Sequence, residues 1–256
     1  MSNFDIKNKV VQANDLVQFS KWNLSAIPLK VFKALVSCID TKHPPKDNTV
    51  TISKKELYDL LGTNDDTNYT YLREQVRSLQ KQIIEIRRAD GSIVSLSMVP
   101  TVVWPPKESD KLVECTFSKE LMPYLIDLHE RFLQYDVAAL KNFKSKYGLI
   151  LYEYLLSRER QERQSEHKYS ISIENLRLLT ATENKFKAFR EMNRKVVIQA
   201  TEDINSAGVE FLVQAKNNGK RGVKATHVEF TLRKRTSCTE TNFDIVAHPE
   251  WIKREI

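Results

Sequence analysis

The segments Val50-Thr-Ile-Ser-Lys-Lys-Glu-Leu-Tyr-Asp-Leu60 and Tyr169-Ser-Ile-Ser-Ile-Glu-Asn-Leu-Arg-Leu-Leu179 align without a gap at an offset of 119 residues. Each has the pattern of a short strand that runs into a short helix. Ser53 and Glu56 have the spacing of a capping box, in which the hydroxyl and the carboxylate bind free amides at a helix start. Ser172 can cap the second helix in the same way. The sequence therefore predicts the same local unit twice.

A polar loop and a long helical pattern follow each segment. In the first copy, apolar side chains recur at alternating spacings of three and four, which places them on one helix face. These residues are Tyr69, Leu72, Val76, Leu79, Ile83 and Ile86. In the second copy the face consists of Phe186, Phe189, Val196 and Ala200, with Asn193 where Val76 stands.

Each copy is also flanked by matching elements. The apolar helix predicted over 28–39 corresponds to the pattern over 147–155, and a hairpin follows each long helix, over 84–98 and 209–233. Asp90-Gly91 and Asn218-Gly219 accept the positive φ angles of tight hairpin turns. The order helix, strand, helix, long helix, hairpin is that of a winged helix, a helix-turn-helix variant. We therefore predict an α+β fold with two tandem winged-helix domains.

Length and composition agree with two packed domains. The chain has 256 residues, 41% hydrophobic and 29% charged. We place the boundary between residues 125 and 126, so that residues 1–125 form the N-terminal domain and residues 126–256 the C-terminal domain with a short tail. The polar start and the lack of a long apolar run predict a cytoplasmic protein without a membrane segment. Scattered cysteines and histidines predict neither a disulfide, a metal site nor a cofactor.

The formal charge of +7 is concentrated in one stretch, since residues 185–235 hold 12 Lys and Arg against 5 Asp and Glu. This concentration predicts that the second domain makes the main DNA contact. Lys187, Arg190 and Arg194 are spaced three and four apart, so they form one stripe opposite the apolar face. The candidate DNA-binding residues of the second domain are Lys187, Arg190, Glu191, Arg194, Lys195, Lys216, Lys220, Arg221, Lys224, Arg233, Lys234 and Arg235.

Base reading is expected from the helix and phosphate contact from the wing. Arginine can bond guanine O6 and N7, and Glu191 could accept from cytosine N4, whereas cations on a wing hold register. The alternative is a charged face that is only solvated. In the less basic first domain the candidates are Thr70, Arg73, Arg77, Lys81, Arg87 and Arg88. That surface equally suits contact with a second subunit.

With these residues placed, the chain resembles the iteron-binding plasmid replication initiators (RepA/RepE-type initiator Rep proteins). The resemblance is strongest over 117–155, in Phe117-x4-Met122-Pro-Tyr-Leu125 and Leu151-Tyr-Glu-Tyr-Leu155, and it continues from Glu174-Asn-Leu-Arg177 to Val228-Glu-Phe230. It implies monomers that bind directly repeated origin sequences in double-stranded DNA, open the origin and recruit host replication initiator and helicase proteins. It also implies a homodimer through the N-terminal domain that represses its own promoter.

An enzyme, a transcriptional repressor and a protein-binding scaffold are the alternatives to a replication initiator. An enzyme that nicks DNA needs a His-x-His metal pair and an ATPase needs a GxxxxGK[ST] loop; the sequence has neither, so we expect no enzyme. A winged-helix transcriptional repressor without initiator activity would share the fold and the basic helices. A protein-binding scaffold would share the fold alone.

Overall fold

The computed structural model describes residues 2–62, 69–88, 90–128, 131–159, 166–220 and 223–235. Its first part contains β1 (Lys9–Ala13), α1 (Asn14–Gln18), α2 (Ala26–Ser37), β2 (Thr49–Ile52), α3 (Lys54–Leu61), α4 (Tyr69–Lys81), β3 (Ile83–Arg87), β4 (Ile93–Ser97), β5 (Thr101–Val103), β6 (Val113–Thr116), η1 (Met122–Tyr124), β7 (Phe132–Asp136) and η2 (Val137–Asn142). Its second part contains α5 (Lys146–Arg158), β8 (Glu166–Ser172), α6 (Ile173–Thr180), α7 (Phe189–Met192), the π-helix η3 (Asn193–Ile198), α8 (Gln199–Ser206), β9 (Phe211–Asn217) and β10 (His227–Lys234).

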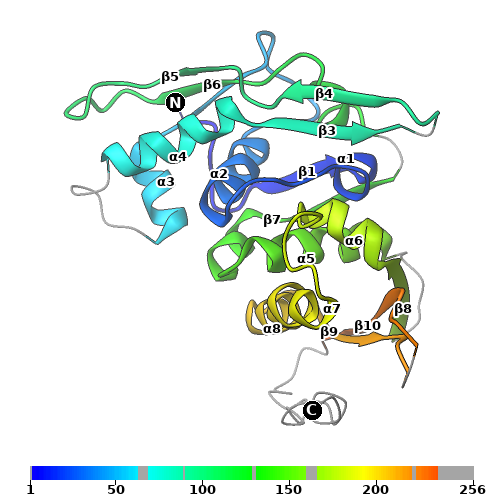
Figure 1. Ribbon diagram of the computed structural model, residues 1–256. Coiled ribbons are helices and arrows are strands. Elements are labelled where there is room, and N and C mark those ends of the chain that lie inside the picture. Colours follow the sequence, from blue (N-terminus) through cyan, green and yellow to red (C-terminus); the bar gives the residue numbers. More distant parts are fainter. Residues whose placement is uncertain are drawn as a thin grey trace.

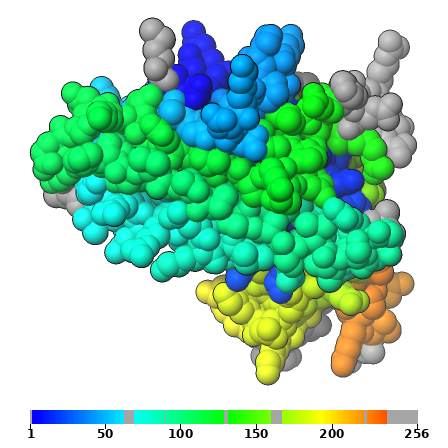
Figure 2. Space-filling model, turned by 90° about the horizontal axis from the view of Figure 1, so that it is seen from above, coloured from blue at the N-terminus to red at the C-terminus, as the bar shows by residue number. Residues whose placement is uncertain are grey.

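Two antiparallel sheets with the same strand order identify the two domains (Figure 1). The first has the order β2-β6-β5 and the second the order β8-β10-β9. In both, the strand that precedes the helix pair lies beside the last strand of the domain. The prediction of two tandem winged-helix domains is confirmed. Seen from above in Figure 2, the second domain, coloured yellow to orange, protrudes at one edge of the face formed by the first domain.

The wing of the first domain is a different hairpin from the one that the sequence predicted. Strands β3 and β4 do pair, and Gly91 has the expected positive φ of 85°. However, β2 pairs with β6, so the hairpin equivalent to the second domain's wing is β5–β6. The assignment of Arg87 and Arg88 to the wing is therefore wrong. The β3–β4 hairpin is an insertion between the long helix and the wing.

The wing of the second domain has a wider loop than predicted. Phe211, Val213, Val228, Phe230 and Leu232 all face the core, as their alternation predicted. The strands nevertheless end at Asn217 and resume at His227, so a tight Asn-Gly turn is wrong.

Capping signals placed the starts of α3 and α6 correctly, whereas the end of the first long helix was predicted too late. Ser53 and Glu56 form both bonds of the predicted capping box, and the Ser172 hydroxyl accepts from the amide of Asn175. The first long helix ends at Lys81, so Ile83, expected on its buried face, lies on β3 and is 55% exposed.

Helix α5 lies between the two domains (Figure 1) and packs against α1 of the first domain and α8 of the second. Its fully buried Tyr152 has ring centroids of three aromatic residues within 6 Å: Tyr135 on β7 at 5.3 Å, Phe143 at 5.1 Å and Phe211 on β9 at 5.7 Å. Strand β7 also pairs with β1 at the start of the chain. The boundary between residues 125 and 126 stays a prediction.

A buried polar cluster joins α5 to the first domain. Lys33 Nζ on α2 lies 2.8 Å from Glu153 Oε2 on α5 and 2.9 Å from the side-chain oxygen of Gln12 on β1. Glu153 Oε1 accepts from Gln12 Nε2 and from the Tyr135 hydroxyl, both at 2.7 Å. The Lys33 ammonium also lies 4.1 Å from the ring centroid of Trp22. Each charge therefore has hydrogen-bonding partners, as buried charges require.

Candidate nucleic-acid interface

The long helix of the second domain is continuous from Phe189 to Ser206 and contains a π-helical segment. Its buried face includes the adjacent pairs Met192/Asn193 and Val196/Val197, four residues apart. The π-helical segment covers Asn193–Ile198, where the hydrogen bonds run from i to i+5. In the first half of the helix the exposed residues are Arg190, Glu191, Arg194 and Lys195. The structure thus brings these four predicted residues together on one surface.

Lys187 lies outside that helix, which corrects the predicted three-residue stripe. Phe186 has a φ of 50°, in the left-handed region, and a right-handed helix cannot pass through such a residue. The helix begins three residues later, after Ala188. Lys187 is exposed in the turn, next to the start of the helix rather than on it.

The wing of the second domain carries a group of exposed cations. Lys216 lies near the end of β9, and Lys220 and Lys224 lie in the loop. Arg221 lies outside the described residues. The Asn218 side chain closes the base of this loop, since its Oδ1 accepts from the amides of Thr226 at 2.8 Å and His227 at 3.0 Å.

Arg233, Lys234 and Arg235 lie at the opposite end of β10 from this loop. About nine residues separate Lys224 from Arg233, which corresponds to about 30 Å of extended chain. Arg235 donates to the backbone oxygen of Asn205 at the end of α8, and Lys234 is 4.0 Å from Glu159. The structure therefore separates these three residues from the cations of the wing loop.

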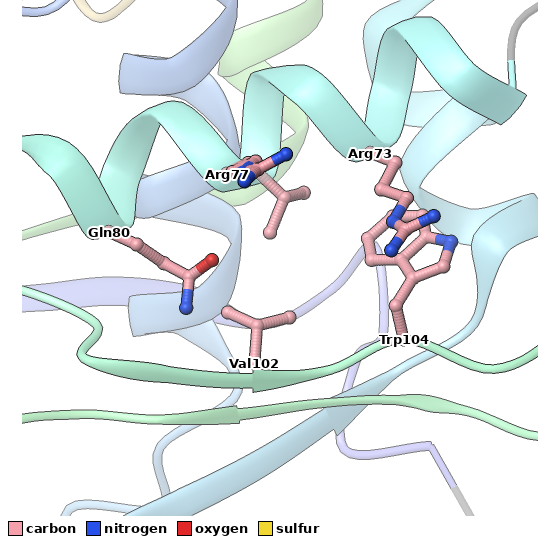
Figure 3. A pocket seen from close by; sticks show the side chains of 6 residues that line it. Arg73, Arg77, Gln80, Val102 and Trp104 are labelled. Carbon is pink, nitrogen blue, oxygen red and sulfur yellow. The ribbon is translucent and has the colours of Figure 1, made fainter.

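In the first domain, α4 presents its predicted polar residues to one side. Thr70, Arg73, Arg77 and Lys81 are all exposed, while Leu72, Val76 and Leu79 are buried. A groove of about 330 Å³ lies between this helix and β5. Figure 3 shows the side chains that line it. Arg73, Arg77 and Gln80 line it from the helix, and Val102 on β5 and Trp104 just after β5 line it from the wing. The groove therefore lies between the long helix of this domain and its wing.

Two residues of the helices fix this wing in place. Lys54 Nζ donates to the backbone oxygens of Lys107 and Ser109 at 2.7 and 2.6 Å. The Tyr69 hydroxyl donates to the backbone oxygen of Pro105 at 2.8 Å, and its ring stands edge-on to that of Trp104. Neither role was predicted from the sequence, because the wing was expected at the β3–β4 hairpin.

The β3–β4 hairpin presents Arg87 beside apolar side chains. Ile83 and Ile93 are 55% and 59% exposed, and Ile93 is the cross-strand partner of Arg87. Arg88 follows β3 and is also exposed. Arg87 lies on, and Arg88 directly after, a separate two-stranded sheet, so neither arginine belongs to the β5–β6 wing.

No helix within the described residues is long and apolar enough to cross a bilayer. The same residues contain no group of three His, Cys, Asp or Glu side chains that could hold a metal ion. Among the cysteines, Cys38 and Cys115 are buried, and burial raises the pKa of the Cys115 thiol to about 12.

Two winged helices, each with an exposed cationic helix, define a tandem winged-helix protein. The sequence profile described as "Initiator Replication protein, WH1" matches residues 9–156, and that described as "Initiator Rep protein, WH2" matches residues 172–232. These ranges cover most of the chain. The chain therefore belongs to the family of initiator replication proteins, which confirms the resemblance found in the sequence.

Individual relatives agree with this assignment. A "Replication initiation protein" of Escherichia coli is 25% identical over 200 residues, which are 77% of this chain and 62% of that protein. The chain thus spans less than two thirds of that relative's length. The structure titled "Crystal structure of Pi initiator protein in complex with iteron DNA" has a TM-score of 0.74 at 19% identity and covers 90% of this chain and 99% of that one. The latter likeness concerns the fold.

Proposed function

We propose that this protein initiates plasmid replication by binding directly repeated origin sequences, the iterons, in double-stranded DNA. The observation that carries the proposal is the position of Arg190 and Arg194, which project into solvent from a helix whose opposite face is buried. Neither side chain has a role in the core. Arginines on a helix-turn-helix reading helix can bond guanine O6 and N7 in the major groove.

The relatives support the DNA-binding part of this proposal. The similar fold of the Pi initiator was solved with iteron DNA bound to it, and the Escherichia coli relative is a replication initiation protein. In our proposal the wing cations of the second domain, Lys216, Lys220, Arg221 and Lys224, contact phosphates and hold the helix in register.

The first domain makes an accessory DNA contact in this proposal. Its groove combines two arginines with an apolar floor, and the cations can neutralise a phosphate backbone that passes between helix and wing. The β5–β6 wing holds Lys107 and Lys111 against Glu108 and Asp110, so it carries no excess of positive charge. The second domain therefore supplies most of the electrostatic affinity.

The same proposal includes a homodimer that represses the protein's own promoter, formed through the N-terminal domain. Ile83 and Ile93 give the β3–β4 hairpin an exposed apolar surface, which suits contact with another subunit. In the monomeric, origin-bound form the protein opens the origin and recruits host replication initiator and helicase proteins. It does so as a DNA-binding protein and not as an enzyme.

A transcriptional repressor without initiator activity is the second candidate, because it would use the same reading helix. Footprinting on the DNA that flanks the gene distinguishes the two. Several protected direct repeats of about 20 base pairs, or two helical turns, beside an AT-rich tract support initiation. One protected inverted repeat over the promoter supports repression alone. Binding that is insensitive to salt and sequence would contradict both, since phosphate contacts make affinity salt-dependent.

A further inference from the structure

The Arg177 side chain on α6 binds the turn that leads into the reading helix of the second domain. Its Nη1 donates to the backbone oxygens of Thr182 at 3.1 Å and Lys185 at 2.9 Å. Its Nη2 donates to those of Phe186 at 2.8 Å and Lys187 at 3.2 Å. One guanidinium thus donates hydrogen bonds to four backbone carbonyl groups within six consecutive residues. Hydrogen bonds from a charged donor are stronger than those between neutral groups.

The turn needs such a partner because its backbone is unfavourable by itself. Ala181 and Phe186 have φ angles of 52° and 50°, and neither is a glycine. Residues with a Cβ adopt this left-handed region only when surrounding contacts enforce it. The Phe186 side chain is partly buried against the core, and its backbone carbonyl oxygen accepts one of the hydrogen bonds from Arg177. The guanidinium therefore stabilises the conformation that aims the chain at Ala188, where the helix begins.

We propose that Arg177 is a positioning residue for DNA reading: it sets the direction and rotation of the reading helix and does not itself contact DNA. All four terminal N–H groups of a guanidinium are used by four carbonyls, which leaves none of them for a base or a phosphate. Arg190 is the second residue of the helix that follows the turn, so a shift of the turn moves its side chain directly. This inference rests on the proposed function, because it concerns the same helix.

The first repeat has a different residue at the position of Arg177. In the gap-free alignment of the two repeats, Leu57 matches Leu176 and Tyr58 stands where the second domain has Arg177. A tyrosine side chain has one O–H donor, against five N–H donors in a guanidinium. The sequence of the first repeat therefore does not place a comparable set of donors at this position.

The test uses the full chain and a duplex that the wild-type protein selects from a randomised library, with a shuffled duplex of the same composition for comparison. The variants are Arg177→Gln, Arg177→Lys and, as a charge-matched control, Arg158→Gln at the exposed end of α5. For each protein we would measure the affinities for both duplexes and their salt dependence. We would also measure the melting temperature and amide hydrogen exchange over residues 181–189.

We expect Arg177→Gln to reduce the ratio of the two affinities at least about tenfold, the discrimination supplied by one good bidentate base contact. Affinity for the shuffled duplex and its salt slope should stay as in the control, while amide exchange in the turn becomes faster. Arg177→Lys should be intermediate, because lysine keeps the charge and has three donors in place of the fork.

Three outcomes overturn the proposal. Discrimination equal to wild type removes the positioning role. An equal loss on both duplexes, with a salt slope reduced by about 0.9, identifies Arg177 as a phosphate ligand. If Arg177→Gln does not fold, an Arg177→Lys variant that discriminates like wild type decides against the proposal. A wild-type protein that selects no sequence instead overturns the proposed function itself.

Discussion

Lys33 Nζ and Glu153 Oε2 are 2.8 Å apart, and their side chains are 0% and 1% exposed. The pair connects α2 of the first domain to α5, the helix against which the second domain packs. Burial lowers the pKa of Lys33, while the neighbouring carboxylate opposes that shift. The ion pair is therefore retained at a desolvation cost, and its loss should be felt at the junction of the two domains.

Lys33→Met should lower the free energy of unfolding by about 3–5 kcal/mol, because it leaves the Glu153 carboxylate buried without its cation. Urea unfolding followed by circular dichroism measures this change. Lys9→Met is the matched control: Lys9 pairs with Asp136 at the surface, so its loss should cost less than about 1 kcal/mol. Replacing both Lys33 and Glu153 by methionine should restore much of the loss. If Lys33→Met and Lys9→Met lower the free energy of unfolding equally, the buried pair has no special structural role.

Replacing Arg190 and Arg194 together by alanine should remove most of the difference in affinity between the repeat duplex and a random duplex, expressed as the ratio of the two affinities. Each good bidentate contact is worth about 1–3 kcal/mol, and both side chains project from the same exposed helix face. A gel-shift competition measures the ratio. Glu202→Ala, exposed on the C-terminal half of the same helix, is the control. Unchanged discrimination in the double variant would exclude this helix as the reader.

Neutralising Lys220 and Arg221 should weaken binding to all duplexes alike. The slope of log affinity against log salt should flatten by up to about 0.9 for each DNA phosphate that the variant no longer neutralises. Lys234→Ala provides a comparison, since Lys234 lies at the other end of β10 near Glu159; it should leave the slope unchanged. A loss confined to the repeat sequence would mean that the wing reads bases.

Lys146 should make stability rise with pH above neutrality. Burial, together with the nearby Lys185, lowers the pKa of its ammonium to about 8 from an ordinary value of 10.5. Between these two values the unfolded chain binds more protons than the folded protein, so the free energy of unfolding increases with pH in that window. Relative to Lys146→Met, wild type should gain about 1 kcal/mol between about pH 8 and pH 9.5. Chemical unfolding of both proteins across the window measures the difference, and a flat difference would refute it.

The repeat was visible in the sequence because its signals are local. The capping box of Ser53 and Glu56 and the alternation of Phe211 and Val213 each depend on neighbours a few residues apart. Such patterns report the element and its buried face before any tertiary contact is known. They also placed Arg190, Arg194, Arg73 and the other helix cations on exposed faces.

The first wing was missed because it depends on pairing between distant residues. Val50 on β2 lies opposite Cys115 on β6, and the β5 strand that completes the sheet has only three residues. A short strand followed by Trp104-Pro105-Pro106 gives almost no alternation to detect. The wing was predicted at the Asp90-Gly91 hairpin instead, because Asp-Gly is a strong turn signal.

Backbone conformation and side-chain-to-backbone bonds were equally invisible. Nothing in the spacing of apolar residues indicates that Phe186 is left-handed, or that the helix widens into a π-turn at Asn193. Arg177 was noticed only as part of a motif, because its four partners are carbonyl groups, which every residue possesses.

The position of Glu153 limits how this protein can be recombined with its relatives. A chimera joined between residues 125 and 126 would bring α5, with its carboxylate, from one parent and Lys33 and Gln12 from the other. Unless both parents carry the same charges at these positions, the hybrid buries an anion with no counter-ion, which costs several kcal/mol. Exchange of DNA specificity between such proteins should therefore succeed more readily when the graft begins after α5, beyond Arg158, than when it begins before that helix.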